Sequence, residues 1–491
     1  MRHLADIVPY VFAKTNGVAL TQLGDDHAEI VVREGGRAGA VAELRRTLGV
    51  PVRARRASNG EFDELLGSLY GGGEAGAAAL ADDLAQDLDL SRLLQEIPKV
   101  EDLLDAQADA PLIRLLNALL TQALRDGASD IHIEPYETRS VVRLRVDGTL
   151  HDLIEPARAL HAAIVSRVKI MAQLDIAEKR LPQDGRITLR VAGKPVDVRV
   201  STIPTGHGER VVLRLLDKQA GRLDLSRLGM SGDTLAHMDC LIREPHGIVL
   251  VTGPTGSGKT TTLYAALSRM DAGALNIMTV EDPIEYDLDG ISQTQISARI
   301  DMTFARALRT ILRQDPDVIM IGEIRDLETA QIAVQASLTG HLVFATLHTN
   351  DAASAVTRLV DMGVEPFLLA SSLIGVLAQR LVRLLCGECR TPQLFDTGQL
   401  RAAGVVEQGG TFYTANGCPT CKRSGYRGRT GIYELLGVDD ALRPLIHDRA
   451  SEQALREHAV ARGMRTLRED GMRWATRGLV SLEEIVRVTR E

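Results

Sequence analysis

A glycine-rich run near the middle of the chain has the composition and spacing of a phosphate-binding loop. The run GPTGSGKT fits the pattern G-x-x-x-x-G-K-[ST], in which glycines let successive backbone N–H groups point at phosphate oxygens. Lys259 would reach the β- and γ-phosphates, and the hydroxyl of Thr260 would ligate Mg²⁺. The run therefore predicts a nucleotide-binding site with Mg²⁺. The expected nucleotide contacts are Gly253, Pro254, Thr255, Gly256, Ser257, Gly258, Lys259, Thr260 and Thr261.

Hydrolysis also needs carboxylates near the terminal phosphate, and two stretches offer them. Glu323 follows the apolar run DVIMIG and would hold Mg²⁺ through its water shell. Glu281, Asp282 and Glu285 cluster in VEDPIEY, after the run NIMTV, where one of them could orient the attacking water. Taken alone, this second cluster is equally typical of helix capping or of a salt bridge.

Two histidines flank the apolar run VFATL. His341 and His348 would lie at opposite ends of one strand, which argues against a shared metal ion. An imidazole can serve as a hydrogen-bonded structural group or as a sensor of the γ-phosphate. The sequence leaves both interpretations open.

Four of the five cysteines form two C-x-x-C pairs. The pairs Cys386 and Cys389, and Cys418 and Cys421, are separated by 28 residues, a spacing that suits a closed tetrahedral Zn²⁺ site. A redox pair would need a thioredoxin-like setting that the sequence lacks, and a rubredoxin-like iron site is the other alternative. Zinc is the favoured prediction. The remaining Cys240 is expected to be a small buried hydrophobe.

Two predicted domains must position these groups. From about residue 230, short apolar strands such as GIVLVTG, DVIMIGEI and HLVFATLH alternate with helix-length segments, which predicts a buried parallel sheet. The phosphate-binding run lies between the strand GIVLVT and the helix TTTLYAALSRM, as its chemistry requires. Before residue 220, IHIEP, SVVRLRVDG and ERVVLRLLD alternate apolar with polar residues, which predicts a smaller α+β domain.

Composition excludes some classes of protein. A net charge of −8 with 3% aromatic residues argues against a protein that binds nucleic acid. The first residues lack the apolar core of a secretory signal, and Phe367–Leu385 carries Gln379, Arg380 and Arg383, so no membrane span is expected.

The predicted segments are an N-terminal domain (1–70), a flexible acidic linker (71–107), an α+β domain (108–225), an ATPase core (226–385), a cysteine module (386–425) and a C-terminal helical region (426–491).

As a set, four motifs resemble one family. GPTGSGKTTTLY, VEDPIEY, LRQDPDVIMIGEIRD and TGHLVFATLHTND are similar, in this order, to the Walker A, Asp box, Walker B and His box of the secretion ATPase superfamily of type II and type IV systems. The resemblance extends from about residue 108 to the end. It implies a hexameric ring in which a PAS-like domain is joined flexibly to a RecA-like P-loop ATPase domain, with ATP between them.

The resemblance also implies roles for single residues. Glu285 corresponds to the general base and Glu323 to the Walker B acid. Arg199 and Arg210 fall where members of the family place arginines that approach the phosphates, and Arg186 belongs to the same group. Guanidinium groups that arrive as domains close would neutralise charge on the γ-phosphate. Ordinary surface or strand positions are favoured for Arg143, Arg145 and Arg214.

Two features discriminate within the superfamily. Retraction ATPases of type IV pili lack a tetracysteine module, whereas type II secretion motors and many pilus assembly ATPases carry one. The opening IVPYVFAKTNGVAL is similar to that of type II secretion motors, whose first domain docks the cytoplasmic domain of an inner-membrane platform protein. The resemblance thus implies a cytoplasmic motor, attached peripherally to the inner membrane, that drives pseudopilus assembly for secretion across the outer membrane.

Further partners and alternatives follow from the same resemblance. A polytopic membrane protein of the platform is a second expected partner, the motor is expected to be a homo-hexamer, and no nucleic acid partner is expected. A type IV pilus assembly ATPase is the near alternative and a nucleic-acid translocase the distant one. A scaffold that binds ATP without turnover is disfavoured, because Lys259, Glu285 and Glu323 are all present.

Overall fold

The computed structural model describes residues 8, 12–13, 16–24, 27–58, 61–62, 65, 109–191, 194–216, 224–297, 300–395 and 411–490. The chain divides into two compact units, one of Met1–Leu144 with Leu150–Leu215 and one of Arg145–Thr149 with Leu216–Glu491. The predicted acidic linker (71–107) lies outside the described residues.

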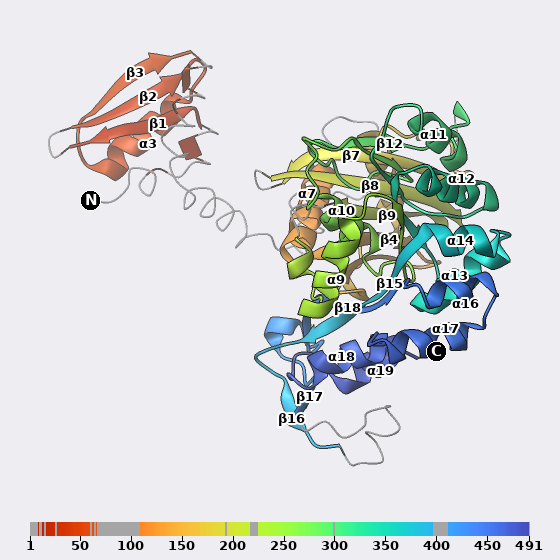
Figure 1. Cartoon of the computed structure of the whole chain (residues 1–491). Coiled ribbons are helices and arrows are strands. Elements are labelled where there is room, and N and C mark those ends of the chain that lie inside the picture. The colour runs from red at the N-terminus through yellow and green to blue at the C-terminus, as the bar shows by residue number, and fades with distance from the viewer. Residues whose placement is uncertain are drawn as a thin grey trace. The chain divides into compact units, whose positions relative to one another are not determined.

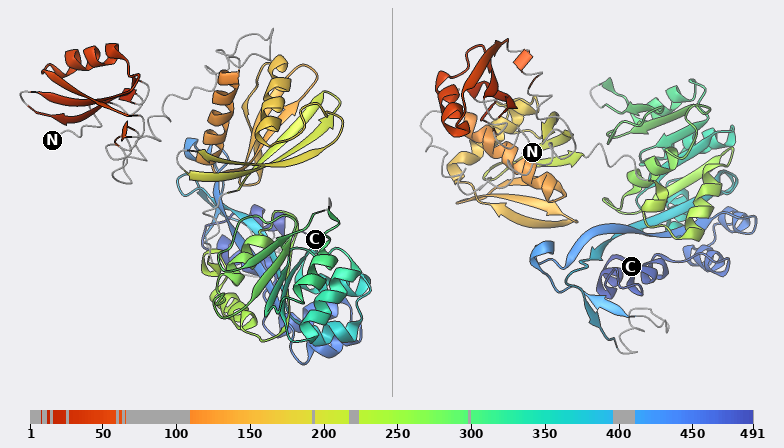
Figure 2. Two further views of the ribbon diagram at one scale, coloured as in Figure 1. Left: turned by 90° about the horizontal axis from the view of Figure 1, so that it is seen from above. Right: turned by 90° about the vertical axis from the view of Figure 1, so that its left-hand side faces the viewer.

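In the N-terminal domain, helix α3 lies against a small sheet (Figure 2). Its elements are β1 (Val18–Leu23), β2 (Ala28–Arg33), α3 (Ala38–Leu48) and β3 (Val52–Ala57). The strands lie in the order β1-β2-β3, with β1 antiparallel and β3 parallel to β2. A parallel pair needs a crossover, which α3 provides. Leu20, Ile30 and Leu44 are buried between sheet and helix, whereas residues 53–56 of β3 are exposed.

The α+β domain is a sheet with helices on one face (Figure 2), and the strand pairs β4–β9 and β7–β8 are antiparallel. Its strand order is β6-β5-β4-β9-β8-β7. Ile131 and Ile133 of β4 are fully buried, as expected for the apolar positions, but the polar residues His132 and Glu134 beside them are buried too. The elements are α7 (Asp109–Arg125), β4 (Ala128–Pro135), β5 (Ser140–Val146), β6 (Thr149–Ile154), α8 (His161–Met171), β7 (Gln183–Val191), β8 (Lys194–Thr205) and β9 (Gly208–Leu216).

The predicted parallel sheet is present in the second unit, with helices on both faces (Figure 1). Its strand order is β12-β11-β13-β14-β10-β15-β18, and only β18 pairs with its neighbour in an antiparallel way. The strands are β10 (Gly247–Thr252), β11 (Ile277–Glu281), β12 (Ser292–Gln295), β13 (Val318–Ile321), β14 (Leu342–Leu347), β15 (Leu373–Leu385) and β18 (Tyr426–Gly437).

Alternate residues of β10 enter two separate cores, which explains why the strand is apolar throughout. Ile248 and Leu250 pack with α11 (Phe304–Ile311), α12 (Leu327–Leu338) and α13 (Ala352–Asp361). Val249 and Val251 pack on the other face with α9 (Gly232–Ile242) and α10 (Lys259–Leu267). A strand covered on both faces has no solvent-facing position for a polar side chain.

The apolar stretch Phe367–Leu385 divides into α14 (Pro366–Ser372) and β15. Among the described residues, no helix combines the length and the apolar character that a membrane crossing requires. The remaining elements are β16 (Thr391–Gln393), β17 (Phe412–Thr414), α16 (Leu442–His447), α17 (Glu452–Ala461), α18 (Leu467–Ala475) and α19 (Leu482–Val488).

The region expected to be helical from residue 426 begins instead with a strand. β18 pairs with β15, and helices begin only at Leu442. Within β18, Glu434 is buried and accepts hydrogen bonds from the N–H groups of Ala352 (2.9 Å) and Leu467 (3.3 Å), the first residues of α13 and α18. Burial raises the pKa of Glu434. This acidic residue therefore joins two helix N-termini to the sheet.

Candidate functional site

The phosphate-binding loop joins β10 to α10, as the sequence predicts. Gly258 has a φ of 90°, a backbone conformation that glycine adopts without strain. At Gly253, a Cβ would lie 2.5 Å from the carbonyl oxygen of Gln379 and 2.6 Å from Oγ of Ser257, so only glycine fits. The loop thus leads into the N-terminal end of α10, where helix N–H groups attract anions.

Lys259 lies against its own loop. Its Nζ donates to the carbonyl oxygens of Gly253 (2.8 Å) and Pro254 (3.2 Å). Burial lowers the pKa of Lys259 to about 8, the charge of Glu323 opposes that shift, and the charge of Arg380 adds to it. The ammonium group is therefore closer to losing its proton than an exposed lysine would be.

His348 connects this lysine to the carboxylate that follows β13. Its Nδ1 lies 3.4 Å from Nζ of Lys259, and its Nε2 lies 2.7 Å from Oε1 of Glu323. These contacts fit a neutral imidazole that carries its proton on Nε2 and accepts from the lysine at Nδ1. The first residue of α10 and two residues that follow β13 and β14 therefore meet at one place.

The two histidines of β14 lie at opposite ends of the strand, as expected, and differ in their contacts. Nδ1 of His341 lies 2.8 Å from the carbonyl oxygen of Ala336 and 3.2 Å from Oγ1 of Thr339. These neighbours belong to the last turn of α12 and the residue after it. His341 thus has the contacts of a structural histidine, whereas His348 lies beside the phosphate-binding loop.

The acidic cluster after β11 separates into different environments. Glu281 is buried and accepts from Oγ1 of Thr279 (2.5 Å), Nε2 of Gln293 (3.1 Å) and, at close range, the hydroxyl of Tyr264. Burial raises the pKa of Glu281. Glu281 therefore belongs to an internal network, whereas the partly exposed Glu285 donates its backbone N–H to the Tyr264 hydroxyl at 3.4 Å.

Arg325 links the Asp box to the Walker B residue. Its guanidinium group makes a close ion pair with Glu323, and Nη1 lies 3.7 Å from Oδ2 of Asp282. Arg325 and Asp282 are both exposed, so the second pair contributes little free energy. The contact connects the residues that follow β11 and β13, which are already paired in the sheet.

The arginines of the α+β domain are largely engaged with carboxylates. Arg210 lies 2.8 Å from Oε1 of Glu134 and 3.1 Å from Nδ1 of His132. Arg186 and Arg214 pair at 2.9 Å with Asp197 and at 2.8 Å with Asp130, and Arg143 pairs closely with Glu134. Arg199 lies opposite Arg186 in the register of β7 and β8. These residues belong to the first unit, so the place of Arg199 and Arg210 at the phosphates stays a prediction.

Two residues of β15 were not predicted as part of the site. Gln379 donates its Nε2 to the carbonyl oxygen of Ser257 at 2.7 Å, and Arg380 donates Nη2 to the carbonyl oxygen of Asn350 at 2.8 Å. The only sequence signal was a pair of polar residues that interrupts an otherwise apolar run. Because β15 runs parallel to β10 and Ala378 pairs with Thr252, both residues lie just beyond the carboxyl end of β10.

The four predicted cysteine ligands converge. Their sulfur atoms all lie within 4.8 Å of one another, with separations of 3.9 Å (Cys386 to Cys418), 3.8 Å (Cys389 to Cys421) and 3.7 Å (Cys418 to Cys421). A tetrahedron with Zn–S bonds of about 2.3 Å has edges of about 3.8 Å. The donor set therefore fits Zn²⁺. The fifth cysteine, Cys240, is exposed on α9, so the expectation that it is buried was wrong.

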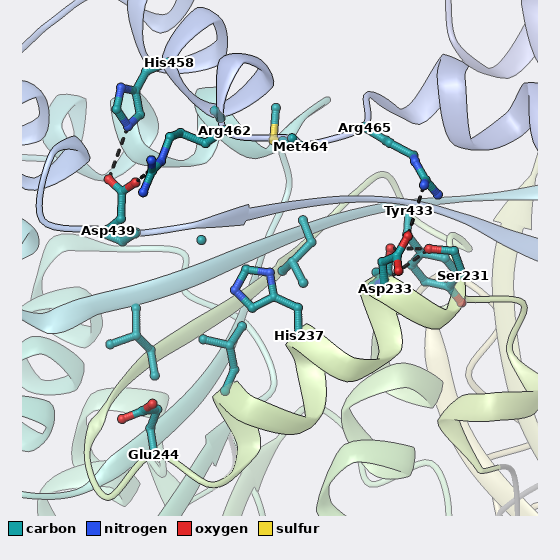
Figure 3. A pocket seen from close by; sticks show the side chains of 18 of the residues that line it. Ser231, Asp233, His237, Glu244, Tyr433, Asp439, His458, Arg462, Met464 and Arg465 are labelled. Atoms are coloured by element: carbon teal, nitrogen blue, oxygen red, sulfur yellow. Dashed lines mark hydrogen bonds and ion pairs between the residues drawn. The ribbon is translucent and has the colours of Figure 1, made fainter.

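A separate pocket of about 520 Å³ lies between α9, β18 and the helices that follow it (Figure 3). Its arginines already have carboxylate partners: Arg465 lies 3.0 Å from Asp233, and Arg462 lies 3.0 Å from Asp439. The phosphate-binding loop does not line it. This pocket is therefore not part of the predicted nucleotide site.

Comparison with known proteins decides the family. The family described as "Type II/IV secretion system protein" matches residues 105–487, and a domain described as part of "GSPII protein E" matches residues 8–70. The chain belongs to the type II/IV secretion system protein family. Within this secretion family, it is 64% identical over 485 residues to type II secretion system protein HxcR of Pseudomonas aeruginosa, with 99% of each chain covered. It is 56% identical over 454 residues to type II secretion system ATPase E of Vibrio cholerae, covering 92% of this chain and 90% of that one.

Solved structures agree with this family. The pilus retraction motor PilT with bound ADP has a TM-score of 0.53 at 26% identity, covering 77% of this chain and 97% of that one. The ATPase DotB of Legionella pneumophila has a TM-score of 0.58 at 20% identity, covering 76% and 95%, and shows the fold alone. The predicted α/β fold class, the recognition as a type II secretion ATPase and the ATP-hydrolysing activity are confirmed, and pilus assembly is not favoured.

Proposed function

We propose that this secretion ATPase hydrolyses ATP at the loop between β10 and α10 to drive pseudopilus assembly through inner-membrane partners. The observation that carries the proposal is the meeting of Lys259, at the start of α10, with Glu323 and His348, which follow the neighbouring strands β13 and β14. Ligands of open α/β sheets bind at this carboxyl edge.

The residues at this edge have complementary tasks. Lys259 binds the β- and γ-phosphates, Thr260 and Glu323 would hold Mg²⁺, and Glu285 accepts the proton of the attacking water. When bound, Mg²⁺ supplies positive charge that stabilises the phosphates. Arg199 and Arg210 would add positive charge when the α+β domain closes on the nucleotide. His348, already between Lys259 and Glu323, is positioned to sense the γ-phosphate.

The tetracysteine cluster is proposed to hold one structural Zn²⁺. The sulfur of Cys421 accepts N–H bonds of 3.1 Å from Cys418 and Gly425, and such bonds stabilise a metal-bound thiolate. Four protein ligands leave no open coordination position. The ion would therefore stabilise the connection between β15 and β18 and would take no part in hydrolysis.

The N-terminal domain is proposed to dock the cytoplasmic domain of an inner-membrane platform protein, with the chain cytoplasmic and assembled as a homo-hexamer. Support comes from the match of residues 8–70 to a domain of GSPII protein E and from the exposed edge strand β3, which carries Arg53, Arg55 and Arg56. Three exposed arginines on one edge strand fit an acidic partner surface. A polytopic platform protein would be the second partner.

Phosphate release from ATP and Mg²⁺ by the full chain tests this function, with Lys259→Ala as the inactive control. Activity that rises with a platform partner or acidic phospholipid agrees with the proposal. Stimulation by DNA or RNA alone would favour a nucleic-acid translocase. Binding without any phosphate release would favour a scaffold.

A further inference from the structure

Gln379 of β15 lies against both ends of the phosphate-binding loop, with its backbone oxygen near Gly253 and its side-chain amide at Ser257 and Gly258. Its hydrogen bond of 2.7 Å to the carbonyl oxygen of Ser257 is enclosed, because the two residues are only 1% and 4% exposed. A Cβ on Gly253 would lie 2.5 Å from the backbone oxygen of Gln379, and a Cβ on Gly258 would lie 3.2 Å from its Nε2. Gln379 therefore packs along one side of the phosphate-binding loop.

The geometry of a peptide unit gives this contact a consequence. The carbonyl group of Ser257 and the N–H group of Gly258 belong to one planar trans unit, so they point in opposite directions. A loop that binds phosphate turns its N–H groups inward, which turns the carbonyl groups outward. A buried outward carbonyl oxygen needs a donor, and Gln379 supplies it.

We propose that Gln379 is a positioning residue that holds the N–H group of Gly258 toward the nucleotide phosphates. The inference rests on the proposed nucleotide site and deepens it. Without the amide, the Ser257 carbonyl loses its donor, and the peptide unit can turn over because Gly258 tolerates either orientation. The loop then offers the phosphates one N–H group fewer.

The test is the affinity of the full chain for a fluorescent ADP analogue. Gln379→Met keeps the size of the side chain but removes the donor, and we expect affinity about ten-fold weaker than wild type. Gln379→Glu keeps the shape, but its carboxylate only accepts hydrogen bonds. We expect weak binding at neutral pH that recovers, relative to wild type, as pH falls and the carboxyl group gains a proton to donate. Gln335→Glu, on the exposed face of α12, is the matched control and should follow wild type.

The outcomes separate the inference from the function on which it rests. KM for ATP should rise in Gln379→Met more than kcat falls, and its unfolding temperature without nucleotide should show that it folds. If Gln379→Met does not fold, the pH series of Gln379→Glu decides. Equal affinity in Gln379→Met and wild type, or a Gln379→Glu affinity that follows the wild-type pH dependence, overturns the inference alone. A wild-type chain that binds no ADP overturns both.

Discussion

Nε2 of His348 lies 2.7 Å from Oε1 of Glu323, which joins the end of β14 to the end of β13. The opposite nitrogen of the same ring lies 3.4 Å from Nζ of Lys259. We expect a γ-phosphate that binds Lys259 to meet this chain of contacts. Binding of ATP and the orientation of Glu323 would then be coupled through one imidazole ring.

Replacing His348 should impair hydrolysis more than binding. We expect His348→Ala to lower the rate of phosphate release by about a hundred-fold, because Glu323 loses its neutral hydrogen-bond donor, while affinity for ADP changes little. His341→Ala is the matched control, since this histidine lies at the other end of β14 and contacts Ala336 and Thr339. Equal activity of the two variants would show that His348 is only structural.

The pKa of Lys259 predicts how nucleotide binding depends on pH. Burial lowers this pKa to about 8, so the lysine carries its charge below that pH and loses it above. Affinity for ADP should fall as pH rises from about 7 to 10, by up to ten-fold per unit above the pKa. Arg380→Ala removes a neighbouring positive charge and should move the inflection to higher pH. A flat profile over this range would contradict the assignment.

Arg210 and Arg143 allow a comparison around one carboxylate. Both contact Glu134, whose pKa is lowered because its hydrogen bonds and arginine neighbours outweigh burial. We expect Arg210→Ala and Arg143→Ala each to lower stability at neutral pH by about 1 kcal/mol, measured by thermal unfolding. A lowered pKa stabilises the fold above the unfolded pKa, so this difference should shrink as pH falls below about 4.

The two arginine variants are expected to differ in ATPase activity. Arg210→Ala should also abolish phosphate release, whereas Arg143→Ala should retain it, since only Arg210 is expected to approach the phosphates. Normal activity in Arg210→Ala would remove this residue from the closed site.

Metal analysis of freshly purified, reduced protein should find one zinc per chain. Cys389→Ser should lose the zinc and unfold at lower temperature, because three thiolates no longer complete the tetrahedron. Cys240→Ser, which changes an exposed cysteine on α9, should keep both the zinc and the stability of wild type. Wild-type protein without zinc would rule out the proposed site.

The parts that the sequence predicts well are local or buried throughout. The run around Lys259 contains its own glycines, strand and helix, and β10 is apolar because both of its faces are covered. The cysteine pairs are recognisable because ligand spacing reflects metal geometry. The residues that define each of these features are close together in the sequence or, like the four cysteines, all of one residue type.

The features that the sequence did not predict depend on contacts between residues far apart in the chain. Gln379 and Ser257 are 122 positions apart, so nothing near either residue indicates their hydrogen bond. Glu281 and Glu285 belong to the same motif. What distinguishes them is the buried hydrogen-bond network of Glu281 with Tyr264 and Gln293, which the sequence does not reveal. Glu434 was expected in a helical region because the pairing of β18 with β15 has no local signal.

The central claim is that Glu285 activates water for ATP hydrolysis at this loop. Its most direct test is phosphate release from ATP in a single turnover by wild type and Glu285→Gln, with binding of a fluorescent ATP analogue measured on the same samples. We predict that Glu285→Gln binds the nucleotide as wild type does but releases no phosphate. Phosphate release by Glu285→Gln at the wild-type rate would contradict the claim.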